Sequence, residues 1–149
     1  MSIGEICTRE VIVAAEDTSV ETAAELMRRY HVGDLVVAKD LDGKRVPLGI
    51  VTDRDIVVEV VATGLDPKVL TVGDIMGQEL VTGREEDGIL DTLQIMRTKG
   101  VRRLPILDEE GALLGIVTVD DLIEVFAEEL TDLARVISRG RAREAKSRV

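Results

Sequence analysis

Short apolar runs alternate with helical patterns along this chain, and the same order of elements is predicted twice. The first half predicts a strand over residues 11–13, a helix after Thr18, strands over 35–38 and 48–51, and a helix over 53–61. The second half predicts a strand over residues 80–82, a helix after Asp87, strands over 104–107 and 113–117, and a helix over 119–129. These strands are short and apolar on both sides, which is typical of a sheet that helices cover.

Polar residues mark the expected start of each helix. Thr18 followed by Glu21 forms a capping-box pattern, so we expect Thr18 to cap the first helix. Asp87 is the corresponding candidate in the second half. Thr52 and Thr118 are expected to cap the helices that follow the last strand of each half.

The two halves also match residue by residue, which indicates an internal repeat. Residues 49–56 match residues 115–122 at an offset of 66, and residues 26–28 match residues 95–97 at an offset of 69. One copy of about 60 residues buries only a marginal core, so the copies are expected to pack together. We predict an α/β (α+β) fold of two pseudo-symmetric β-α-β-β-α repeats, packed sheet to sheet, with a C-terminal helical extension. Their expected spans are residues 1–63 and 71–130, forming one compact module, followed by a helical and basic tail over 131–149.

The most closely repeated residues stand where a strand becomes a helix, in the pattern Gly-Ile-Val-Thr-x-x-Asp. A helix N-terminus has free backbone N–H groups and favours negative charge, so it suits a phosphate. The threonine hydroxyl reaches a phosphate or sugar, and the aspartate oxygens suit a pair of ribose hydroxyls. The alternative interpretation is that Thr52 and Thr118 are ordinary N-caps and that Asp55 and Asp121 are first-turn acids.

These residues resemble a tandem pair of cystathionine β-synthase (CBS) domains, an arrangement also called a Bateman module. The resemblance rests on residues 49–56 and 115–122, with support from residues 74–76 and 101–106, and it extends over about residues 1–130. It implies a non-catalytic regulatory module, an energy or metabolite sensor that binds an adenosyl ligand between the copies and signals to a partner. AMP, ADP or ATP is the expected ligand, ahead of S-adenosylmethionine or NAD.

The resemblance also implies a role for each site residue. Asp55 and Asp121 would hold ribose hydroxyls, and Thr52 and Thr118 would contact the ribose or the α-phosphate. Phosphate contacts would come from Arg102, Arg103 and the position before each aspartate, which Arg54 suits and Asp120 does not. The adenine would lie between the segments of Ile12, Val13, Val81 and Thr82. Gly33 and Asp34 stand where the other copy has Arg102 and Arg103, so we expect the two clefts to differ in affinity.

Composition narrows the function classes. The net charge is −10, but residues 132–149 hold six basic and two acidic side chains, so the tail carries +4 and the remainder −14. Such an acidic body repels nucleic acid and anionic membranes. One cysteine and one histidine give no basis for a metal site, and no catalytic constellation or Walker-type loop is found. Without a catalytic constellation the chain is not expected to be an enzyme. Without an apolar run long enough to cross a membrane, it is expected to be cytoplasmic.

The apolar residues Phe126, Leu130, Leu133 and Ile137 follow a helical period past the second repeat. We expect this stripe to be covered in a homodimer, and we expect Gly140 to interrupt the helix. The basic residues from Arg139 to Arg148 are expected to be a solvated terminus. The alternative function is an adaptor or nucleic-acid-associated protein that binds through this basic tail.

Overall fold

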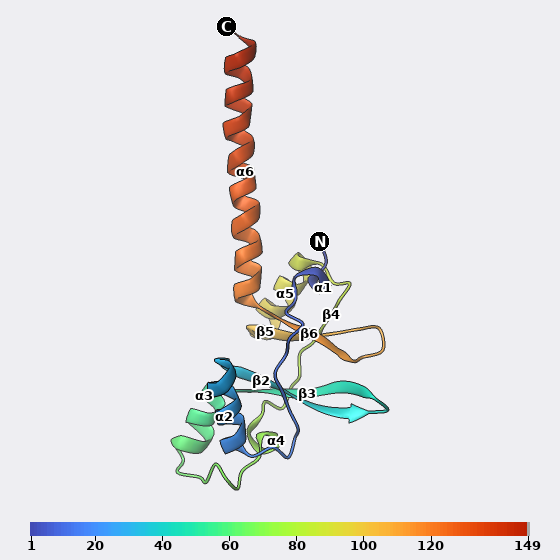
Figure 1. The fold of residues 1–149 in the computed structure, drawn as a ribbon, viewed down its shortest axis with the longest axis vertical. Helices are drawn as coiled ribbons and strands as arrows, with labels where there is room; N and C mark the ends of the chain where they lie inside the picture. Colours follow the sequence, from blue (N-terminus) through green and yellow to red (C-terminus); the bar gives the residue numbers. More distant parts are fainter. Residues whose placement is uncertain (149) are drawn as a thin grey trace.

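The computed structural model describes residues 1–148 and contains two similar halves and one long helix (Figure 1). The first half comprises α1 (Ile3–Ile6), β1 (Val13–Ala14), α2 (Val20–Tyr30), β2 (Asp34–Leu41), β3 (Lys44–Thr52), α3 (Asp53–Ile56) and the π-helical η1 (Val57–Val61). The second comprises α4 (Val72–Ile75), β4 (Gly83–Arg84), α5 (Ile89–Lys99), β5 (Arg103–Leu107), β6 (Leu113–Thr118) and α6 (Val119–Ser147). Two three-stranded sheets, in the orders β1-β2-β3 and β4-β5-β6, confirm the predicted α/β pair with a C-terminal helix.

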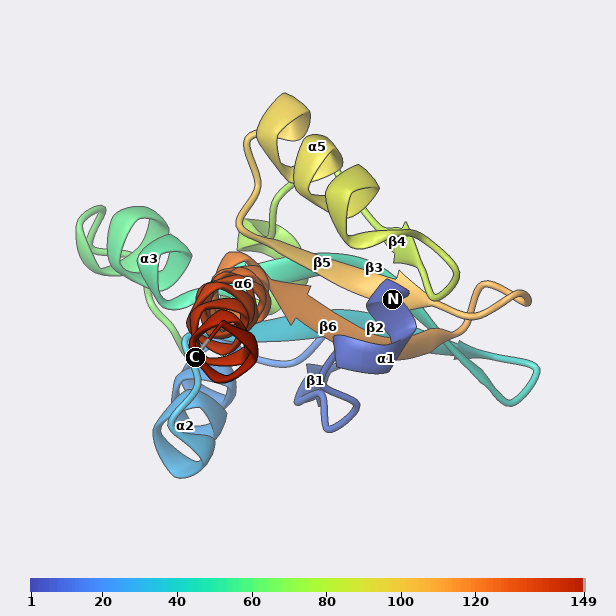
Figure 2. The ribbon, with the colours of Figure 1, turned by 90° about the horizontal axis from the view of Figure 1, so that it is seen from above.

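Each sheet buries one face against its own helices and turns the other toward the second sheet. In the first half, Leu35 and Val37 of β2 pack with Ala23 and Met27 of α2. Val36 is also fully buried, and the alternation of side chains along a strand places it on the opposite face. The two sheets lie over one another with α2 and α5 outside them (Figure 2). The module therefore has two separate helix-covered cores and a sheet-to-sheet contact between them.

The short segment that precedes each repeat is built into the other half. Ile3 of α1 belongs to the core of the second half with Leu104, and its N–H donates to Asp87 O at 2.8 Å. Val72 of α4 belongs to the core of the first half, and its N–H donates to Thr18 O at 2.8 Å. Neither core is complete without a segment from the far side of the sequence.

Several boundaries differ from the sequence prediction, since β2 continues to Leu41 and β3 already begins at Lys44. The first strands start two or three residues later than expected, at Val13 and Gly83, where the strand registers with β2 and β5 begin. Ser19, not Thr18, caps α2, since Ser19 Oγ accepts from the N–H of Thr22. Thr18 Oγ1 instead accepts from Ala15 N–H in the preceding turn.

In the second half, Gly88 is the N-cap of α5, not Asp87. Asp87 Oδ2 accepts from the N–H of Arg84, so this side chain closes the turn before the helix. The prediction that Gly140 interrupts the last helix was also wrong, because α6 continues to Ser147. An interior glycine costs a helix only about 1 kcal/mol, which flanking residues of higher helix propensity can offset. Within residues 1–148, no helix is both long and apolar enough to cross a membrane.

The glycines that open the two repeated motifs differ in the kind of atom that a side chain there would meet. A Cβ on Gly115 would lie 2.6 Å from the backbone oxygen of Thr8. The backbone of Thr8 cannot move away easily, because its N–H and its carbonyl oxygen are both hydrogen-bonded to Ile116. A Cβ on Gly49 would meet the sulfur of Met76 at 2.7 Å, but that side chain is flexible.

We therefore expect Gly115→Ala to lower the free energy of unfolding by about 3 kcal/mol and Gly49→Ala by about 1 kcal/mol. Urea denaturation of both variants measures the difference. Equal losses would show that the chain segment around Thr8 yields as easily as a methionine side chain.

Candidate functional site

A cleft of about 560 Å³ opens between the two halves where β3 ends. Its walls come from both halves, so a ligand in it would touch both repeats. The lining residues of the first half are Ile50, Thr52, Asp53, Arg54 and Asp55. Those of the second half are Gly77, Glu79, Leu80, Val81, Gly100, Val101, Arg102 and Arg103.

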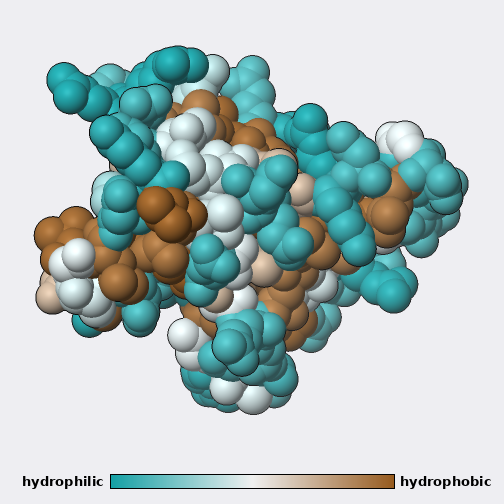
Figure 3. Space-filling model, turned by 90° about the horizontal axis from the view of Figure 1, so that it is seen from below, coloured by the Kyte–Doolittle hydropathy of each residue, from teal (hydrophilic) through white to brown (hydrophobic). Residues whose placement is uncertain are grey.

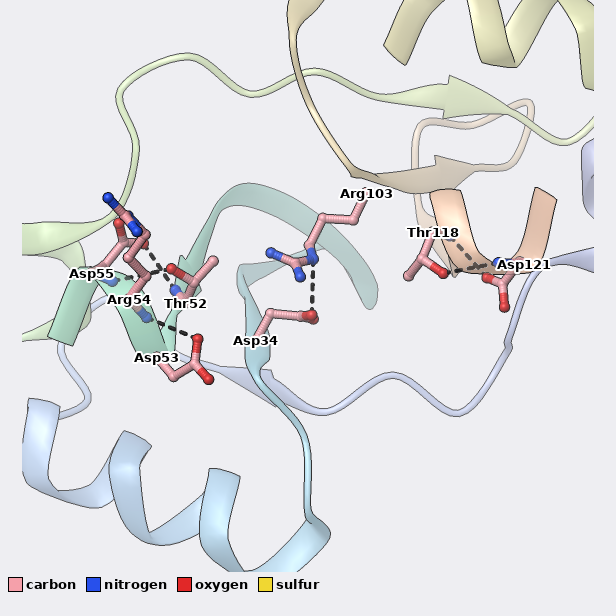
Figure 4. A network of polar contacts seen from close by, with 8 residues as sticks. All are labelled: Asp34, Thr52, Asp53, Arg54, Asp55, Arg103, Thr118 and Asp121. Carbon is pink, nitrogen blue, oxygen red and sulfur yellow. Dashed lines mark hydrogen bonds and ion pairs between the residues drawn. The ribbon is translucent and has the colours of Figure 1, made fainter. Parts of the chain in front are cut away.

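The strand-to-helix corner of the first half is fixed by a reciprocal cap. Thr52 N–H donates to Asp55 Oδ2 at 2.9 Å, and Asp55 N–H donates to Thr52 Oγ1 at 3.1 Å (Figure 4). This arrangement satisfies two backbone donors at the start of α3 and holds the carboxylate in one orientation. It uses one carboxylate oxygen, Oδ2, and leaves Oδ1 for another donor. The capping role of these residues is thus present, and it does not exclude ligand binding.

The same cap is formed in the second half. Thr118 N–H donates to Asp121 Oδ2 at 2.8 Å, and Asp121 N–H donates to Thr118 Oγ1 at 3.2 Å. Figure 4 shows this pair well away from Thr52 and Asp55. The two corners are therefore alike locally, and their surroundings decide what each can bind.

Three arginines bring positive charge to the first corner. Arg54 follows directly from the cap, while Arg102 and Arg103 enter from the start of β5. Among the ion pairs formed within residues 1–148, neither Arg54 nor Arg102 takes part. Two guanidinium groups are thus free to meet an anion in the cleft, where bidentate contact with phosphate is favourable.

Arg103 is held by a carboxylate of the opposite half. Its Nε lies 3.0 Å from Asp34 Oδ2, and both side chains are partly buried. The Nε makes no aligned hydrogen bond, so the contact is an ion pair. Burial raises the pKa of Asp34, the charge of Arg103 opposes that rise, and nearby Asp53 adds to it. Arg103 therefore ties β5 to the start of β2.

The structure gathers half of the predicted site residues around one cleft. Thr52, Arg54, Asp55, Val81, Arg102 and Arg103 all line it. Six others do not line it: Ile12, Val13, Thr82, Thr118, Asp120 and Asp121. Thr118 and Asp121 belong to the second corner. Val13 belongs to β1, and Ile12 directly precedes that strand.

Sequence reasoning missed part of the cleft wall. Gly77, Glu79 and Leu80 follow α4, and Gly100 ends α5 in a left-handed conformation with φ of 67°. The signal for Gly100 was present, since glycine favours that conformation at a helix end. Residues 77–80 had no such signal, because their place depends on α4 packing into the first half. In residues 1–148, no three His, Cys, Asp or Glu side chains gather to hold a metal ion.

Comparisons with known proteins agree with the doubled architecture. The family model described as "CBS domain" matches residues 3–62 and 72–128. The uncharacterized protein MK0525 of Methanopyrus kandleri is 39% identical over 126 residues, which are 84% of this chain and 62% of that protein. This chain thus spans less than two thirds of that relative.

Two solved structures show the same fold. A hexameric CBS-CP12 protein from bloom-forming cyanobacteria matches with a TM-score of 0.73 and 29% identity over 99% of this chain and 84% of that chain. The CBS domain pair of protein MJ0100 was solved in complex with 5′-methylthioadenosine and S-adenosyl-L-methionine. It matches with a TM-score of 0.73 and 24% identity over 87% of this chain and 98% of that chain.

Proposed function

Because this chain belongs to the CBS domain family and forms a CBS pair, a regulatory module, we propose that it senses adenine nucleotides. The proposed site is the cleft between the end of β3 and the start of β5. One observation carries the proposal: a fixed carboxylate–hydroxyl pair, an apolar wall and three arginines line the same 560 Å³ space. Small-molecule sites commonly occupy clefts of about 300–1,000 Å³ with a few convergent polar groups.

Each part of an adenine nucleotide has a matching group in the cleft. The free Oδ1 of Asp55 accepts from the ribose hydroxyls, and Thr52 contacts the ribose or the first phosphate. Arg54 and Arg102 bind the phosphates, with Arg103 beside them. The adenine lies against the apolar side of Leu80 and Val81. The arginines favour AMP, ADP or ATP over S-adenosylmethionine, because the sulfonium of that compound is itself positively charged.

The second corner is a poorer site, and we propose one nucleotide per chain. Asp120 stands in place of Arg54, and a carboxylate repels phosphate. Asp34, which stands in place of Arg103 in the pseudo-symmetric arrangement, is already engaged by Arg103. The predicted inequality of the two clefts thus follows from which half supplies the arginines.

Regulation would follow from the position of the ligand between the halves. A nucleotide that touches Asp55 in the first half and Arg102 in the second favours the relative position that allows both contacts. The free-energy change that the nucleotide can transmit to a partner cannot exceed the difference between its binding free energies for the two arrangements.

Isothermal titration with AMP, ADP, ATP, NAD and S-adenosylmethionine tests the proposal on protein freed of co-purified ligand. We expect saturable binding of an adenine nucleotide at one site per chain, with S-adenosylmethionine weaker by at least roughly tenfold. Arg102→Gln should weaken ATP more than adenosine, because it removes a phosphate contact only. No heat from any of the five ligands, with folding confirmed by circular dichroism, would overturn the proposed function.

A further inference from the structure

The long helix α6 leaves the body of the protein after its first two turns. Every described residue from Phe126 to Arg148 is exposed, and the helix projects away from both sheets (Figure 1). In proteins a helix gains most of its stability from packing of its apolar face, which this exposed part of α6 lacks, and Gly140 weakens it further. Its surface is therefore incomplete as the single chain presents it. Apolar side chains also reach the surface elsewhere (Figure 3), but among residues 1–148 it is in α6 that a regular apolar spacing coincides with a division of charge.

The apolar residues of α6 follow the spacing of a coiled coil. From Val119 the intervals alternate four and three residues through Ile123, Phe126, Leu130, Leu133 and Ile137 to Gly140. This alternation is the heptad pattern whose two apolar positions form a seam between paired helices. We call residues Ile123, Phe126, Leu130, Leu133 and Ile137 the α6 seam. Leu130, Leu133 and Ile137 are 69%, 63% and 60% exposed.

The charges of α6 are divided between its two ends. Residues 119–132 contain six acidic side chains and no basic ones, whereas residues 133–148 contain six basic side chains and one acidic. The helix dipole favours this direction of charge, but its effect fades within the first and last turns. It therefore does not account for charges such as Glu129 and Arg139 in the middle of the helix.

This division selects one partner and one orientation. Two parallel copies of α6 would set acidic against acidic and basic against basic along the seam. Two antiparallel copies set each acidic half against the basic half of the other, which favours association and opposes the parallel register. We propose that the α6 seam is an interface with a second copy of this chain, paired as an antiparallel coiled coil.

One antiparallel register centres the seam on Leu133 and Ile137 and pairs charges on its flanks; nearer its ends, Leu130 and Phe126 lie opposite Gly140 and Glu144. With Leu133 of one copy opposite Ile137 of the other, Glu129 flanks Arg143 of the second copy, twice by symmetry. Ala134 then lies beside its own equivalent at the two-fold axis. The last turn of each helix reaches a groove of about 660 Å³ at the base of the other helix, lined in part by Leu90 and Phe126. The tail charge is thus directed at the acidic body of the second copy.

The first test asks whether the seam makes the dimer. Leu133→Asp changes a side chain that does not touch the body, so the halves should stay folded. We expect the unaltered chain to sediment as a dimer and Leu133→Asp as a monomer with unchanged thermal unfolding of the body. Thr131→Asp is the control, because it adds the same charge outside the seam, and it should remain dimeric. A monomeric unaltered chain, or a Leu133→Asp dimer, would overturn the proposal.

The second test reads the orientation. Ala127 and Ala134 occupy the same heptad position, so a parallel pair brings either one equally close to its equivalent. The antiparallel register instead places Ala134 beside its equivalent and separates the two Ala127 positions by 14 residues, about 21 Å along the axis. A short thiol cross-linker should therefore join chains carrying Ala134→Cys but not Ala127→Cys. The unaltered chain, in which Cys7 is buried, gives the background. Equal cross-linking at both positions, or none at either, would overturn the antiparallel register.

The third test uses the charges. Glu129→Arg should weaken the dimer roughly tenfold at low salt, because two pairs are reversed at once. Adding Arg143→Glu to the same chain should restore the affinity, since the two sites then exchange their charges. Failure of the double variant to recover, while the single variant is weakened, would place Glu129 opposite some other group.

Discussion

Asp55→Ala is expected to weaken adenine-nucleotide binding by roughly 30- to 100-fold, measured by isothermal titration. The substitution removes a carboxylate that lines the cleft, and hydrogen bonds to charged acceptors are worth about 1.5–3 kcal/mol each. It also removes the cap that holds Thr52 N–H, so part of the loss arises from a looser corner. That structural part should appear as a drop of about 1 kcal/mol in the free energy of unfolding.

The chain provides a matched control in Asp121. Asp121→Ala removes the same reciprocal cap from the second half, with partner distances of 2.8 and 3.2 Å. We expect a similar loss of stability but an affinity within about threefold of the unaltered chain. Equal loss of affinity in both variants would contradict the single-site assignment. Loss in Asp121→Ala alone would move the site to the second corner.

Ile3→Ala is expected to lower the free energy of unfolding by about 3 kcal/mol, although Ile3 lies almost at the N-terminus. Terminal residues are commonly tolerant of change, but this side chain is 0% exposed and packs with Leu104 and Ile106. Truncation leaves a cavity that the surrounding β5 and β6 side chains cannot fill. Urea unfolding followed by circular dichroism measures the loss.

Glu10→Ala provides the control, because Glu10 is exposed and its truncation should change stability by less than about 0.5 kcal/mol. If Ile3→Ala were equally silent, α1 would contribute little to the second core. The effect should not depend on nucleotide, since Ile3 lies outside the cleft. This separates a core defect from a binding defect.

The sequence allowed the fold to be predicted where the evidence is local and repeated. The match of residues 49–56 to residues 115–122 marked two equivalent strand-to-helix corners, and both are formed with the expected threonine caps. The arginines at 102 and 103 were expected near a phosphate, and they do line the cleft with Thr52 and Asp55. That they bind a nucleotide there stays a prediction.

The features that the sequence did not predict depend mostly on packing between residues far apart in the chain. Nothing in residues 2–7 or 71–76 indicates that each segment joins the opposite core, because both read as leaders of the repeat that follows. For the same reason the wall formed by Gly77, Glu79 and Leu80 was missed.

Gly140 was overrated as a helix breaker, since a single glycine costs far less than a proline. Thr18 was misassigned because Ser19 is an equally good cap one residue later.

The exchange of α1 and α4 between the halves has a consequence for how the protein forms during synthesis. The first core stays open until Val72 has left the ribosome, so the first repeat cannot complete before the second has begun. Ile3 must then remain free of other contacts until β5 and β6 exist more than 100 residues later. Closing so long a loop is slow, and the N-terminus stays exposed to proteases in the meantime. Completion of the second repeat is thus the event that buries the N-terminal segment of the module.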